Sequence, residues 1–148
     1  MIKKDLSATL TLILTVIFAA VLAVLCFTAP FIFNWYFVGF RHMKNIAQTV
    51  IAAFYFCLPF AVIAIYLLIR LLLRIRRSDV FVAENVSALR GLSWCCAAVC
   101  VITAVAGFFY FPFFAVCAAA GFAALILRVV KNAFSYAVDI KNENELTI

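Results

Sequence analysis

The sequence predicts an all-α integral membrane protein, a bundle of four transmembrane helices with both termini in the cytoplasm. Hydrophobic residues make up 70% of the 148 positions and charged residues only 12%, whereas about a quarter of a soluble domain is charged. Two long stretches, residues 10–33 and 51–69, contain no charged residue. Because a soluble fold must cover its core with polar side chains, we expect these stretches to lie in lipid.

Four apolar segments are long enough to span a membrane, which takes about 20 residues each. We predict spans at residues 10–33, 47–73, 92–110 and 113–130 of a single domain that covers residues 1–148. The first span holds about fifteen Leu, Ile, Val and Phe residues, which together favour insertion by several kcal/mol. After the fourth span, residues 131–148 are expected to form a cytoplasmic helical extension and an acidic tail.

Lysine and arginine gather on one side of the predicted membrane, and positive flanks stay in the cytoplasm. Ten basic residues lie on that side, and only Arg41 and Lys44 lie in the opposite connection. Their position beside the membrane predicts anionic lipid headgroups as partners and no direct nucleic-acid binding. Four of the ten form a predicted basic cluster at the membrane surface: Arg70, Arg74, Arg76 and Arg77.

The connections between the spans differ in character. Residues 34–45 are rich in aromatic side chains, which is typical of a membrane interface. The third and fourth spans meet at a turn around Pro112, which predicts a tight antiparallel hairpin. Small residues supply its contact face, or alternatively the interface of a homo-oligomer: Cys100, Ala104, Gly107, Cys117, Ala120, Gly121 and Ala124.

Residues suited to catalysis or metal binding are missing from the predicted spans. All six cysteines fall within these spans, where cysteine behaves as a small apolar residue. Cys96 and Cys100 share a helix face, but no His, Asp or Glu in the spans completes a metal site. No carboxylate is present there to act as a general acid or base. We therefore expect no enzyme activity, no metal and no cofactor.

The connection between the second and third spans carries the most distinctive polar pattern. From about Val82 the spacing predicts a short amphipathic helix that leads into the third span, with Asn85 among apolar residues and Glu84 facing water. A buried amide needs hydrogen-bond partners. Asn85 is expected either to tie down carbonyl groups at the end of a neighbouring span or to bind a partner protein.

From Phe81 to Arg90, and again from Glu143 to Ile148, the chain resembles the bacterial membrane family catalogued as domain of unknown function 2975. The resemblance is strong in the second half of the chain and rests mainly on topology in the first half. Val82 departs from the Ser or Thr that often follows the phenylalanine and could cap the helix, so Asp79 is the alternative cap. The matching positions are Phe81, Asn85, Val86, Leu89, Arg90, Glu143, Glu145, Leu146 and Thr147.

The resemblance implies a small multi-pass protein of the bacterial inner membrane with no assigned activity. It also implies a gene neighbourhood with a small helix-turn-helix transcription regulator. We interpret the chain as a non-enzymatic interaction or regulatory protein whose cytoplasmic loop and tail, with Asn85 and Arg90, dock such a cytoplasmic partner. The alternative is a small transporter, pore or lipid-handling protein that acts as an oligomer. Transporters ordinarily carry an acid or histidine inside the membrane, and the predicted spans contain neither.

Overall fold

The computed structural model describes residues 2–40, 44–77 and 80–147, and these ranges contain only helices and turns. Each α-helix is long and apolar enough to cross a membrane, with candidate spans at Thr9–Gly39, Asn45–Arg76, Ala83–Gly107 and Phe113–Asn144. The predicted all-α class with four membrane-length helices is confirmed. The order of elements is α1 (Ile2–Asn34), the π-helical turn η1 (Trp35–Phe40), α2 (Lys44–Arg76), α3 (Ala83–Gly107) and α4 (Phe113–Leu146).

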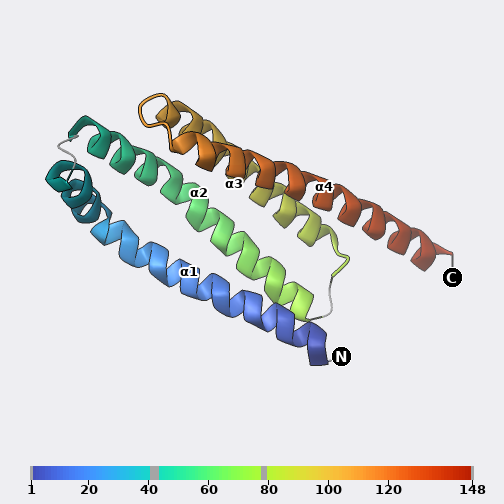
Figure 1. The fold of residues 1–148 in the computed structure, drawn as a ribbon. Helices are drawn as coiled ribbons and strands as arrows, with labels where there is room; N and C mark the ends of the chain where they lie inside the picture. The colour runs from blue at the N-terminus through green and yellow to red at the C-terminus, as the bar shows by residue number, and fades with distance from the viewer. Residues whose placement is uncertain (1, 41–43, 78–79, 148) are drawn as a thin grey trace.

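The helices form an antiparallel row in which each helix packs against the next one in chain order (Figure 1). Within the described ranges, the backbone of α1 approaches only α2 and η1, so α1 forms one edge of the row. The four helices therefore make an open layer and do not close into a ring. Both ends of the chain lie at the same end of the row, as four antiparallel crossings require (Figure 1).

An aromatic cluster joins the two connections at the opposite end of the row. Phe37 of η1 is buried with Ala47 and Val50 of α2. Its ring centroid lies 5.5 Å from that of Tyr110, in the turn between α3 and α4, in an edge-to-face arrangement. Trp35 and Tyr36 remain exposed, as expected of an interfacial belt. Phe37 differs because the turn between α3 and α4 covers it.

A second cluster brings α2, α3 and α4 together near the chain termini. Leu71 of α2 is buried with Leu89 and Leu92 of α3, and side chains of α4, including Phe134, pack against them. Gly91 of α3 lies close to α2, since a Cβ atom on it would be 2.6 Å from a methyl group of Leu67. These contacts hold the end of α2 and the start of α3 against each other and against α4.

The hairpin of α3 and α4 has the close approach that its small residues predict. The sulfur atoms of Cys100 and Cys117 are 3.5 Å apart, and a Cβ atom on Gly121 would lie 3.2 Å from the Cys100 sulfur. The Ser93 hydroxyl also donates a 3.0 Å hydrogen bond to the Ala124 carbonyl across the interface. Small side chains permit this approach in lipid, where no hydrophobic drive brings helices together.

Both ends of α3 differ from the sequence prediction. The amphipathic helix expected before the third span is not a separate element, because residues 83–91 form the first turns of α3 and continue to Gly107 without a break. The apolar residues of this stretch, Val86 and Leu89, are buried by neighbouring helices, so no surface helix forms. α3 ends at Gly107, three residues before the predicted end of the span at residue 110. The Phe114 ring packs across Gly107, and a Cβ atom on Gly107 would lie 3.1 Å from this ring.

Candidate interaction site

The start of α3 is held by Asn85. Val82 precedes the helix in an extended conformation and makes no side-chain capping bond. Asn85 is completely buried, and its amide Nδ2 donates a 2.8 Å hydrogen bond to the Val80 carbonyl. The amide thus ties the connection between α2 and α3 to the first turn of α3. Asp79, the alternative cap, lies outside the described residues.

The other apolar members of the loop motif also stabilise this connection. Val86 and Leu89 are buried. The ring of Phe81 is half exposed, and its centroid lies 5.7 Å from that of Phe134 on α4. Phe81, Asn85, Val86 and Leu89 therefore gather at one place and fix the loop to the helices beside it. Arg90, the charged member of the loop motif, is exposed.

Arg90 lies in a basic pocket between α3 and α4. The pocket has a volume of about 100 Å³ and is lined by Arg90, Ser93 and Trp94 of α3 and by Arg128 and Lys131 of α4. The Arg128 guanidinium carbon lies 5.8 Å from the centre of the Trp94 ring, within the range of a cation–π contact. None of the described residues that line this pocket is acidic.

Sequence reasoning missed this pocket because it used Arg128 and Lys131 only to orient the chain. The predicted hairpin was enough to bring these residues together. A turn near residue 110 sets residue 90 of one helix opposite a residue near 130 of the other, since each lies about 20 positions from the turn. Arg128 and Lys131 also share a helix face at i and i+3.

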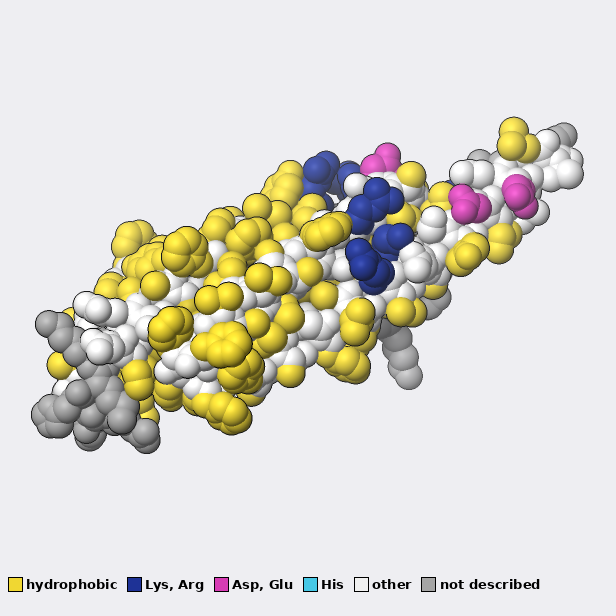
Figure 2. Space-filling model, turned by 90° about the horizontal axis from the view of Figure 1, so that it is seen from above, with side chains coloured by type: hydrophobic (Ala, Val, Ile, Leu, Met, Phe, Trp, Pro, Cys, Tyr) yellow, Lys and Arg dark blue, Asp and Glu magenta, His cyan; other side chains and the backbone are white. Residues whose placement is uncertain are grey.

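The predicted surface cluster occupies the last turns of α2. Arg70, Arg76 and Arg77 are exposed and Arg74 is half buried. The Arg70 guanidinium carbon lies 5.7 Å from the centre of the Tyr66 ring. Figure 2 shows Lys and Arg side chains gathered where a narrow projection leaves the body of the molecule. A belt of positive charge therefore marks this end of the row.

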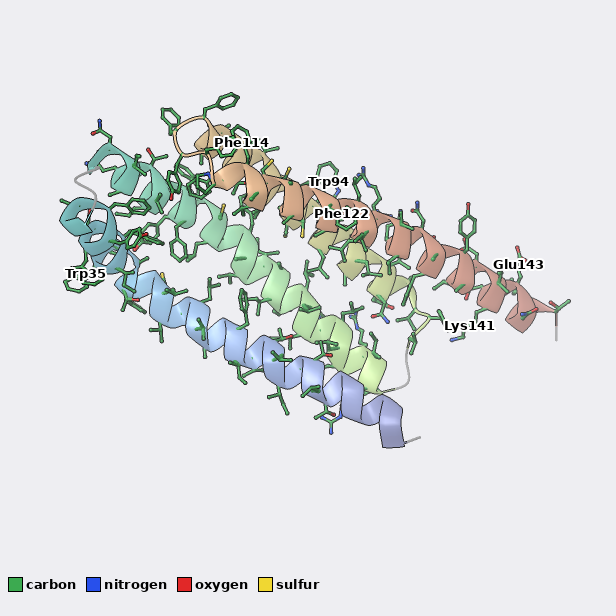
Figure 3. All side chains as sticks on the ribbon, in the orientation of Figure 1. Trp35, Trp94, Phe114, Phe122, Lys141 and Glu143 are labelled. Carbon is green, nitrogen blue, oxygen red and sulfur yellow. The ribbon has the colours of Figure 1, made fainter. Side chains whose placement is uncertain are left out.

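The acidic tail is part of α4. The helix continues to Leu146, which is 88% exposed, and the Thr147 hydroxyl donates a 2.6 Å hydrogen bond to the Glu143 carbonyl. Figure 3 shows Lys141 and Glu143 on the projecting end of α4. Glu143 lies about 18 Å along the helix from Lys131, at roughly 1.5 Å per residue. The structure thus separates Glu143 from Arg90 and from buried Asn85. The Glu145 side chain lies outside the described part.

The projecting end of α4 exposes apolar residues that the sequence analysis did not single out together. Tyr136 is 72% exposed and Ile140 is 59% exposed. They stand four residues apart and share a face of the helix with Glu143, which is also exposed. The spacing of Tyr136, Ile140 and Glu143 at i, i+4 and i+7 could have predicted this shared face from the sequence. Among the described residues, no group of three or more His, Cys, Asp or Glu side chains could hold a metal ion.

Four membrane-length helices in one chain define a multi-pass α-helical membrane protein. The family model described as protein of unknown function (DUF2975) matches residues 34–148, and the chain belongs to this family. The match confirms the resemblance carried by the loop motif and the terminal sequence, and it includes α2, α3 and α4. No curated protein and no solved structure matches the chain.

Proposed function

We propose that this chain is a membrane-embedded interaction protein without enzyme activity, which binds a cytoplasmic protein through the α2–α3 loop and the projecting end of α4. One observation carries the proposal. Beyond Lys131, α4 continues for 15 residues, about 22 Å at 1.5 Å per residue, and its end projects from the body of the molecule (Figure 2). Its Tyr136 and Ile140 are left uncovered by the rest of the described chain.

The spacing of the exposed residues suits recognition of a helix by a groove. Partners of this kind read apolar anchors at i, i+4 and i+7 on one helix face. Tyr136 and Ile140 supply the first two anchors, and Glu143 adds a charge one turn further on. Tyrosine is among the residues that most often dominate binding energy. The α4 end therefore offers both an apolar contact and a charged contact to one partner.

The charge distribution supports a cytoplasmic location for this surface. Arginine and lysine mark the end of the helix row from which α4 projects, and positively charged flanks are retained in the cytoplasm. With this orientation both chain ends face the cytoplasm, and the membrane is the bacterial inner membrane that the family resemblance implies. The resemblance also implies the partner, a small helix-turn-helix transcription regulator.

The loop motif has a supporting role in this proposal. Asn85 holds the connection through the Val80 carbonyl, and its buried amide is not offered to a partner in this conformation. Glu84 and Ser87 are the exposed polar residues on the first turns of α3. The partner would contact these side chains and the α4 end, while the buried members of the motif keep the loop in place.

Co-purification from native membranes after mild crosslinking tests the proposal. We expect the wild-type chain to capture a soluble regulator, identified by mass spectrometry, and the Tyr136→Ala/Ile140→Ala variant to lose it. Phe122→Ala/Ile126→Ala is the matched control, because these exposed residues have the same spacing within the part of α4 predicted from the sequence as the fourth span, residues 113–130. Capture that survives both the tail substitutions and removal of residues 143–148 would refute the proposal.

A further inference from the structure

An apolar groove runs between α3 and α4 on the membrane part of the hairpin. It has a volume of about 420 Å³ and is lined mainly by apolar side chains, including Trp94, Ala97 and Val101 of α3 and Gly121 and Leu125 of α4. From Trp94 to Val101 the groove follows α3 for about 10 Å, at roughly 1.5 Å per residue. The small side chains of Ala97 and Gly121 leave this space open.

The basic pocket lies at one end of this groove. Ser93, Trp94 and Arg128 line both the groove and the pocket, so the two spaces are continuous. Arg90 and Lys131 complete the polar end. Trp94 stands at the junction, beside α4 (Figure 3), and an indole ring is suited to a boundary between apolar and polar surroundings. The combined site is charged at one end and apolar along the rest of its length.

The pocket gathers three basic side chains, and its described lining includes no carboxylate. Arg90, Arg128 and Lys131 line one small space, and no described acidic residue lines it with them. Like charges placed this close repel one another, and a bound anion would relieve the repulsion. The ring of Trp94 holds the Arg128 guanidinium within 5.8 Å. Guanidinium and ammonium groups together form strong, charge-assisted hydrogen bonds with phosphate.

Two other grooves among the described residues lack this polar end. One lies between α1 and α2 and another between α2 and α3, and the residues that line them include no charged side chain. Any acyl chain of the bilayer would fit such surfaces without selection of its headgroup. The hairpin groove is different because its charged end would favour an anionic headgroup over a zwitterionic one.

We infer that the chain binds one anionic phospholipid between α3 and α4. The phosphate lies in the pocket of Arg90, Arg128 and Lys131, and one acyl chain lies in the groove beside Ala97 and Gly121. The basic pocket includes Arg90 near the start of α3, and α2 ends with its arginines just before α3 in the chain, where headgroups would be found. The lipid would strengthen the hairpin at the base of the projecting α4 end.

Native mass spectrometry of the whole chain, released from mild detergent, tests the headgroup. Dioleoyl phosphatidylglycerol and dioleoyl phosphatidylcholine are added at equal concentration. We expect preferential retention of one phosphatidylglycerol, weakened roughly fivefold for each charge removed in Arg90→Gln/Arg128→Gln. Arg76→Gln/Arg77→Gln is the matched control, because it removes the same charge from exposed positions at the end of α2. Equal losses in both variants would overturn the inference.

The Ala97→Phe variant tests the acyl chain, because its ring would fill the groove without changing the charge. We expect phosphatidylglycerol retention to fall severalfold while binding of glycerol 3-phosphate is unchanged. Unchanged retention, together with displacement of the lipid by inorganic phosphate, would instead make the pocket a site for soluble anions and would overturn the inference. Thermal unfolding profiles that match the wild type show that each variant is folded. Arg128→Lys keeps the positive charge and should therefore retain most of the phosphatidylglycerol binding.

Discussion

Replacing Asn85 with leucine should destabilise the protein, because it removes the hydrogen bond from the Asn85 amide to the Val80 carbonyl. Leucine has the same number of side-chain heavy atoms as asparagine, branched at the same carbon, so the substitution opens no cavity, but it removes the Nδ2 group that donates to the Val80 carbonyl at 2.8 Å. Asn85 is fully buried, so the substitution leaves the Val80 carbonyl facing an apolar side chain. An unsatisfied buried acceptor costs about 1–3 kcal/mol. For a chain of this size, that loss corresponds to a midpoint lower by roughly 2 to 12 °C.

The native cysteines provide the assay for this prediction. Cys95 is buried in α3 and is a free thiol, so a maleimide dye that fluoresces on reaction reports its exposure as the protein unfolds in mild detergent. Trypsin cleavage after the exposed Arg76 and Arg77 should also become faster in Asn85→Leu, since the loop is released.

Asn142→Leu is the control for this substitution, because Asn142 is exposed on the projecting helix, and it should shift the midpoint by less than about 2 °C. An Asn85→Leu midpoint equal to that of the wild type would refute the reasoning about the loop.

Three further substitutions or treatments test the α3–α4 hairpin. Ser93→Ala removes the 3.0 Å hydrogen bond to Ala124 and should lower the free energy of unfolding by about 0.6 kcal/mol; a loss above about 2 kcal/mol would contradict this. Gly121→Val should cost about 1–3 kcal/mol, because the Cys100 sulfur lies 3.2 Å from its Cβ position, whereas exposed Ala119→Val should be nearly neutral. Oxidation by copper phenanthroline should join Cys100 to Cys117 in a disulfide within one chain, since their sulfurs are 3.5 Å apart. Loss of maleimide labelling at both thiols measures the disulfide, and disulfide-linked dimers would contradict the prediction.

The sequence predicted the helices because apolar length and small residues act locally. The uncharged runs located the four membrane-length helices, and Cys100, Cys117 and Gly121 predicted the close hairpin contact. The start of α3 was predicted less well, because an amphipathic pattern does not reveal whether its apolar face meets a membrane surface or other helices. Val86 and Leu89 meet neighbouring helices, so the pattern became part of the span. The burial of Phe37 likewise depends on Tyr110, which is distant in sequence.

The candidate site was harder to predict than the fold. Asn85 was identified as a residue that needs a partner, but its acceptor, the Val80 carbonyl, is a backbone group that no side-chain pattern reveals. The pocket of Arg90, Arg128 and Lys131 joins two helices whose register becomes known only from their packing. Tyr136 and Ile140 were part of an expected helical extension, and their exposure follows from the absence of another described helix beside them.

Photocrosslinking in living cells tests the central claim most directly, which is that the projecting end of α4 binds a cytoplasmic protein. Benzoylphenylalanine is introduced at Tyr136 in one sample and at Phe122, on the membrane part of the same helix, in another. We expect an adduct with one soluble protein from position 136 and none from position 122. Adducts with lipid or with the chain itself at both positions, and no soluble protein at position 136, would contradict it.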